Sequence, residues 1–121
     1  MASTLKLFSA WSGYLQQLIP EKRQTLLATM TTAISMIDEP ECVMSYGVPT
    51  IKYNNNYIIA AGAYKQFLSI YPFGNEAIVA NAALFANNEK SKGAVRFSYE
   101  QLPTYQQIKA VVNYNLNKYI R

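Results

Sequence analysis

The 121-residue chain carries eleven basic and seven acidic residues, a net charge of +4, and 50% of its residues are apolar. This fits one domain, residues 1–121, with an ordinary core, and the mild charge disfavours a nucleic-acid surface, where basic side chains gather on one face. The longest apolar run, Tyr57 to Tyr64, is far short of the roughly 20 residues that a membrane-spanning helix needs.

The N-terminal part of the chain has helical periodicity. Phe8, Trp11 and Leu15 recur at spacings of three and four, which predicts a first helix with Trp11 in the core. Pro20 ends that helix and suits the first position of a second one, whose apolar stripe continues to Ile37.

Strand signals follow from Cys42. Residues 43–46 form a short run, and Gly47, Val48 and Pro49 mark a bend or an edge position. Three longer strands are predicted at residues 50–53, 57–63 and 66–71, with a hairpin loop at the three asparagines 54–56.

The C-terminal part predicts two helices around one strand. Asn75 is a suitable N-cap for an apolar helical stripe, and a polar connection, residues 89–93, leads to an alternating strand at 95–99. Thr104 and Gln107 fit a capping box at the start of the last helix. The predicted fold is α+β, with helices packed on a mainly antiparallel sheet in the order α-α-β-β-β-α-β-α.

Three acids after the second helix are the candidate metal ligands. Asp38, Glu39 and Glu41 lie within four positions, and ferrous iron accepts hard oxygen donors, so these carboxylates would bind it weakly with water completing the shell. The alternative is that they are solvated loop acids at the negative end of a helix.

The strand motif offers a second candidate site, a cleft for a small anion or an acidic protein tail. Lysine supplies a point charge, arginine a two-pronged donor and tyrosine a hydroxyl that orients the ligand. The alternative is that the tyrosines stack across strands while the lysine stems spread over them into water. The candidate ligand residues are Tyr46, Lys52, Tyr57, Lys65, Tyr71, Lys92 and Arg96.

Catalytic signals are weak, and we expect a protein that is not an enzyme. The chain has no histidine, so neither Cys42 nor any serine has an imidazole base, and the usual zinc site of nitrogen and sulfur ligands is excluded. A single cysteine and no apolar N-terminal run favour a cytoplasmic location.

Five segments together carry a family resemblance. They are the Leu18-Ile19-Pro20 break, SYGVPTIKY at 45–53, AAGAYKQFLSIYP at 60–72, SKGAVRF at 91–97 and LPTYQQIKAVV at 102–112. On these segments the chain resembles the YdhG-like family of small bacterial proteins, a former domain of unknown function whose Bacillus member is described as a frataxin-like iron chaperone. The resemblance implies a frataxin-like layout, delivery of ferrous iron, and a partner in iron–sulfur cluster or haem assembly.

Overall fold

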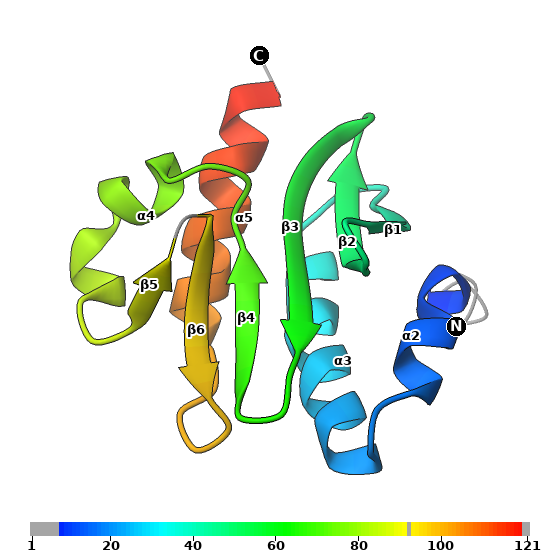
Figure 1. Ribbon diagram of the computed structural model, residues 1–121. Coiled ribbons are helices and arrows are strands. Elements are labelled where there is room, and N and C mark those ends of the chain that lie inside the picture. The colour runs from blue at the N-terminus through cyan, green and yellow to red at the C-terminus, as the bar shows by residue number, and fades with distance from the viewer. Residues whose placement is uncertain (1–7, 92, 120–121) are drawn as a thin grey trace.

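The computed structural model describes residues 8–91 and 93–119, in which one six-stranded sheet packs against helices (Figure 1). This confirms the predicted α+β class. No helix in these two ranges is long and apolar enough to cross a membrane. In chain order the elements are η1 (Ser9–Trp11), α2 (Ser12–Gln16), α3 (Pro20–Ile34), β1 (Glu41–Ser45), β2 (Val48–Tyr53), β3 (Asn56–Ala63), β4 (Phe67–Tyr71), α4 (Glu76–Ala80), η2 (Ala82–Phe85), β5 (Glu89–Ser91), β6 (Ala94–Ser98) and α5 (Tyr105–Tyr119).

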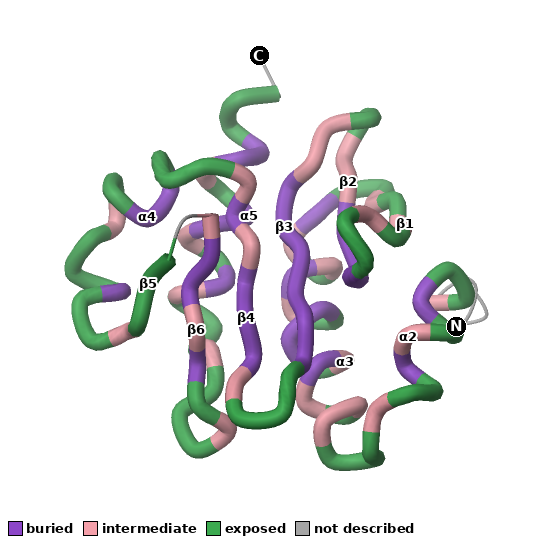
Figure 2. Tube along the Cα trace, viewed as in Figure 1, coloured by how far each residue is buried: buried purple, intermediate pink, exposed green. Residues whose placement is uncertain are grey.

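The sheet is antiparallel throughout, as predicted, with the strand order β1-β2-β3-β4-β6-β5. Helices α3 and α5 pack against β3 and against each other, behind the sheet as Figure 1 is drawn. Figure 2 shows that burial is concentrated along the central strands β3, β4 and β6. We call the face of the sheet opposite α3 and α5 the open face.

The predicted element order is wrong by two short edge strands. β1 covers most of the short 43–46 run, and β5 lies within the segment predicted to be a polar connection. All three residues of β5 are exposed, so backbone pairing with β6 holds it in the sheet without any apolar alternation to reveal it. Val48 and Pro49, expected as a bend, belong to β2, and the turn before them is formed by Tyr46 and Gly47.

Trp11 joins the N-terminal segment to the sheet. Its side chain is fully buried, as predicted, and its Nε1 donates to the carbonyl oxygen of Val43 at 2.8 Å. The indole therefore satisfies its one donor on the edge strand β1 while its ring fills the core.

Helix α5 is fixed at its start and in its middle. The predicted capping box is present, since the Gln107 N–H donates to Thr104 Oγ1 at 3.1 Å and the Thr104 N–H donates to Gln107 Oε1 at 3.0 Å. Two turns further on, the buried Asn115 donates from Nδ2 to the carbonyl oxygens of Ile58 at 2.7 Å and Pro72 at 2.8 Å. One side chain of α5 thus binds both β3 and the end of β4.

β3 contains one extra residue relative to β2. Ile51 pairs with Ile59 but Lys52 pairs with Tyr57, so Ile58 is inserted as a bulge. Ile58 and Ile59 both belong to the core. Because of the insertion, Tyr57 and Ala60 both lie on the open face, on either side of the bulge. The Asn115 amide supplies the hydrogen bond that the displaced Ile58 carbonyl requires inside the protein.

Replacing Asn115 by leucine should lower the free energy of unfolding by about 2–4 kcal/mol, because two buried carbonyl oxygens lose their donor while the volume is nearly kept. Urea denaturation monitored by circular dichroism measures this. The matched control is Asn117→Leu, an exposed asparagine on the same helix, which should change stability by less than about 0.5 kcal/mol. Equal effects of the two variants would contradict the assigned hydrogen bonds.

Candidate functional site

Three of the predicted ligand residues, Tyr46, Tyr57 and Tyr71, come together on the open face with Phe73. Tyr57 stacks on Phe73 with ring centroids 4.8 Å apart. Tyr46 lies 6.2 Å from Tyr57 and 6.5 Å from Phe73 by the same measure. The Tyr57 hydroxyl accepts a hydrogen bond from Ser45 Oγ at 3.0 Å, which ties this ring to the end of β1.

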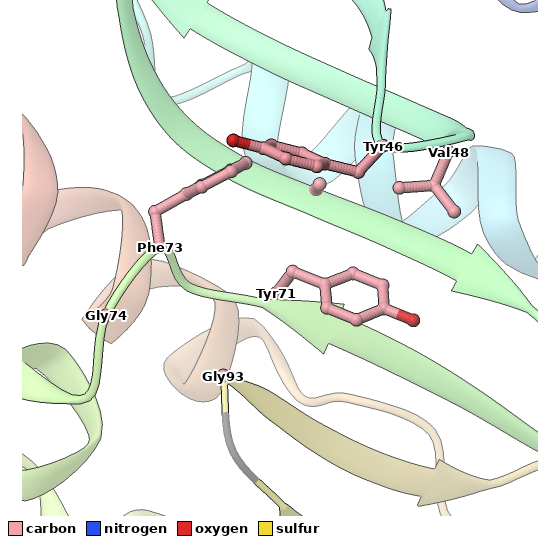
Figure 3. Close-up of a pocket in the computed structure, with 7 residues that line it drawn as sticks. Tyr46, Val48, Tyr71, Phe73, Gly74 and Gly93 are labelled. Atoms are coloured by element: carbon pink, nitrogen blue, oxygen red, sulfur yellow. The ribbon is translucent and has the colours of Figure 1, made fainter.

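A hollow of about 300 Å³ opens between the rings of Tyr46, Tyr71 and Phe73, and we call it the ring pocket. Figure 3 shows Tyr46 reaching toward Phe73, with Tyr71 across from them and Gly93 beyond it. This volume lies at the lower end of the range for small-molecule sites. The lining residues are Tyr46, Val48, Ala60, Tyr71, Phe73, Gly74 and Gly93.

Two of the three aromatic residues that line the pocket, Tyr46 and Phe73, have left-handed backbone conformations. Tyr46 has a φ of 55° and is followed by Gly47 at 78°, as a two-residue hairpin loop between β1 and β2 requires. Phe73 has a φ of 54° and is followed by Gly74 at 113°. An aromatic residue in this conformation costs free energy, roughly 1 kcal/mol, that glycine or asparagine would avoid. Both strained residues project rings into the ring pocket.

Small residues beneath the rings let the pocket form. Ala60 is buried in its floor and pairs with Tyr71 across β3 and β4. Beside it, the ring of Tyr64 lies so close over Gly62 that a β-carbon there would overlap it. The hydroxyls of Tyr64 and Tyr71 are 2.7 Å apart, and burial together with this hydrogen bond raises the pKa of Tyr64. The Tyr64 phenol therefore stays protonated at neutral pH.

The predicted cations do not line the ring pocket in the described part of the chain. Lys52 Nζ lies 5.1 Å from the Tyr57 ring centroid and donates to Asn55 Oδ1 at 3.4 Å. Arg96 pairs with Glu89 at 3.3 Å and covers the Phe67 ring. Lys65 lies in the connection between β3 and β4, away from Phe73. Lys92 lies outside the described residues. The predicted anion cleft is therefore not assembled by Lys52, Lys65 and Arg96.

The three candidate metal ligands share a different hollow. Asp38, Glu39 and Glu41 line a depression of about 380 Å³ together with Tyr53 and Asn54. Glu41 Oε1 accepts the backbone N–H of Asn55 at 3.1 Å, so one carboxylate is already engaged. Across the ranges that the structure describes, no group of three His, Cys, Asp or Glu side chains is arranged to hold a metal ion.

Cys42 is half-buried on the edge strand β1. Burial raises its pKa to about 11, so the thiol is protonated at neutral pH. A nucleophilic cysteine needs a lowered pKa, so this environment does not activate the thiol.

Comparison with known proteins places the fold. The chain matches no protein-family model and no curated protein. The crystal structure of YdhG from Bacillus subtilis, a protein of the DUF1801 family, superposes with a TM-score of 0.83 over 92% of this chain and 91% of that chain. The chain has the fold of a DUF1801 protein. At 15% sequence identity this likeness concerns the fold alone.

The sequence contains a signal for Phe73 that the predicted strand at 66–71 and the helix after Asn75 do not use. Phe73 stands between Pro72, which cannot pair further along β4, and Gly74, which permits a turn. An aromatic residue held in such a turn is exposed unless it packs on neighbouring side chains. Val48, Ala60 and Gly93 carry no such signal, because they contribute only surface and space to the pocket.

The strain at Tyr46 should be measurable. Tyr46→Asn and Tyr46→Ala both remove the ring, which is 85% exposed, but only asparagine relieves the left-handed backbone. We expect the asparagine variant to be more stable than the alanine variant by about 1 kcal/mol in denaturant unfolding. Equal stabilities would show that the turn does not hold Tyr46 under strain.

Proposed function

We propose that this protein is a binding module, not an enzyme, and that its ligand occupies the ring pocket. The observation that carries this proposal is the pair of strained residues, Tyr46 and Phe73, whose rings wall the pocket. Folding alone would favour asparagine or glycine at both positions. Left-handed aromatic residues concentrated at one pocket fit a site that is kept for binding at a cost in stability.

The chemistry of the lining supports binding over catalysis. The seven lining residues contribute rings, aliphatic groups and glycine backbone, and their titratable groups are the phenols of Tyr46 and Tyr71. A pocket of this kind holds a ligand by apolar and aromatic contact, with hydroxyls at the rim to orient it. Its volume suits a small molecule or one side chain of a partner protein.

Screening a small fragment library by two-dimensional ¹H–¹⁵N NMR tests this proposal. We expect binders to shift the backbone amides of Ala60, Gly74 and Gly93, because these residues line the ring pocket. Tyr46→Ala should weaken such binding about fivefold or more, since an aromatic wall contributes on the order of 1 kcal/mol or more.

The matched control for this screen is Tyr105→Ala, which removes another exposed tyrosine from the start of α5, outside the ring pocket. It should leave fragment affinity unchanged. A screen in which no fragment shifts the pocket amides, or in which both variants weaken binding equally, would contradict the proposal.

Weak ferrous iron binding, which the family resemblance implies, is a second candidate function. The observation in its favour is that Asp38, Glu39 and Glu41 line one hollow with the oxygen-bearing side chains of Tyr53 and Asn54. Delivery to an iron–sulfur or haem assembly partner would follow from such binding. The exposed position of these acids fits a site that releases its ion readily.

Anaerobic calorimetric titration with ferrous iron tests the second candidate. We expect weak binding that is lost when Asp38, Glu39 and Glu41 are all replaced by alanine, because hard oxygen donors are removed. The matched control replaces Glu21, Glu89 and Glu100 by alanine, which changes the net charge equally. Absence of binding by the native protein, or equal loss in both triple variants, would remove this candidate.

A further inference from the structure

We infer that the ring pocket recognises a methylated ammonium group, the cationic head of a small molecule such as choline. This inference rests on the proposed function of the ring pocket and adds the class of ligand. Three observations support it: the aromatic rings that line the pocket, the carboxylate near them, and the cation–π contacts that other rings of this protein form.

The walls of the pocket attract cations. The faces of aromatic rings carry a negative partial charge, and several rings around one space form the arrangement that binds quaternary ammonium ions. Tyr46, Tyr71 and Phe73 surround the ring pocket, and Tyr57 stacks on Phe73 at 4.8 Å behind it. Methyl groups on the ammonium spread its charge and make apolar contact with Ala60 and Val48 in the same pocket.

Other aromatic rings of this protein form cation–π contacts with its own lysine and arginine side chains. Each pair places a charged nitrogen group 4.6 to 5.9 Å from a ring centroid. Among the described cations, none lies over Tyr46, Tyr71 or Phe73. The occupied pairs are Lys22 with Tyr99, Lys52 with Tyr57, Arg96 with Phe67, Lys109 with Tyr105 and Lys118 with Tyr114.

The carboxylate of Glu76 does not line the pocket itself but lies beside the lining residue Gly74. A β-carbon added to Gly74 would overlap the carboxylate of Glu76, so this group packs directly beside the glycine backbone. Lys118 lies 3.8 Å from Glu76 and offsets part of its charge, but both side chains are partly exposed and the pair is loose. Lys52 is the predicted cation that approaches the ring cluster, and it lies over Tyr57, which does not line the pocket.

A matched pair of ligands tests the inference. Choline and its neutral isostere 3,3-dimethylbutan-1-ol have the same shape and differ in charge. We expect NMR titration of the full chain to give choline at least about tenfold higher affinity, with shifts at the Gly74 and Gly93 amides. A third titration uses a peptide that carries trimethyl-lysine, in which the ammonium group belongs to a protein segment. We expect choline, the free molecule, to bind more tightly than this peptide.

Two variants separate charge recognition from apolar contact. Phe73→Leu keeps apolar bulk but removes a π-face, so it should reduce choline affinity about tenfold and leave the neutral alcohol unchanged. Glu76→Gln should weaken choline binding severalfold without affecting the alcohol. Tyr105→Leu is the control for loss of an aromatic residue elsewhere.

The outcomes distinguish this inference from the proposed function. Choline preference that is lost in Phe73→Leu supports the inference. Equal or tighter binding of the neutral alcohol at the same amides overturns the inference but supports the ring pocket as a binding site. If neither ligand binds, the inference is wrong. The fragment screen then tests the proposed function separately.

Discussion

Two hydrogen bonds from the buried amide of Asn115 hold together the parts of the sheet on which the ring pocket is built. They reach the carbonyl of Ile58, inside the bulge of β3, and the carbonyl of Pro72, just beyond β4. Tyr57 precedes the first of these residues and Phe73 follows the second, and their rings stack on the open face. A polar side chain in the core therefore sets the distance between two rings on the opposite side of the sheet.

The bulge explains how one strand serves both faces. If β3 alternated regularly through Ile58, Tyr57 would lie on the same face as Ile59, toward α3 and α5. The insertion keeps both isoleucines in the core and turns the tyrosine outward. Because a buried carbonyl without a donor costs about 1–3 kcal/mol, the Asn115 amide beneath the bulge stabilises it.

Stability and the proposed binding function make opposite demands on the rim of the ring pocket. The turns at Tyr46 and Phe73 require left-handed backbone, which asparagine and glycine adopt readily, and the chain places aromatic rings there instead. The folded core, with Trp11, Ile59 and Val111 fully buried, supplies the stability that tolerates this strain. Strain at a functional surface and consistent packing beneath it are the usual division in natural proteins.

Local patterns revealed the parts of this protein that depend on neighbours in sequence. The Thr104–Gln107 capping box, the buried Trp11 and the strands expected at residues 50–53, 57–63, 66–71 and 95–99 were predicted because their signals are short-range. β5 and the bulge are set by backbone pairing with the neighbouring strands β6 and β2 and not by apolar alternation, so the sequence pattern contains little trace of them. Tyr46, Tyr57 and Tyr71 lie together in the structure, as predicted, whereas Lys65 and Arg96 lie outside the ring pocket. Lys65 belongs to the connection between β3 and β4, and Arg96 forms an ion pair with Glu89. The sequence pattern does not reveal either placement.

The most direct test of this account is the set of nuclear Overhauser effects between the Tyr57 and Phe73 ring protons in the native protein and in a folded Asn115→Leu variant. The account predicts strong ring-to-ring effects in the native protein, because the centroids are 4.8 Å apart, and clearly weaker ones in the variant, with the effects among core methyl groups retained. Equally strong effects in both proteins would contradict the claim that Asn115 sets the geometry of the ring pocket.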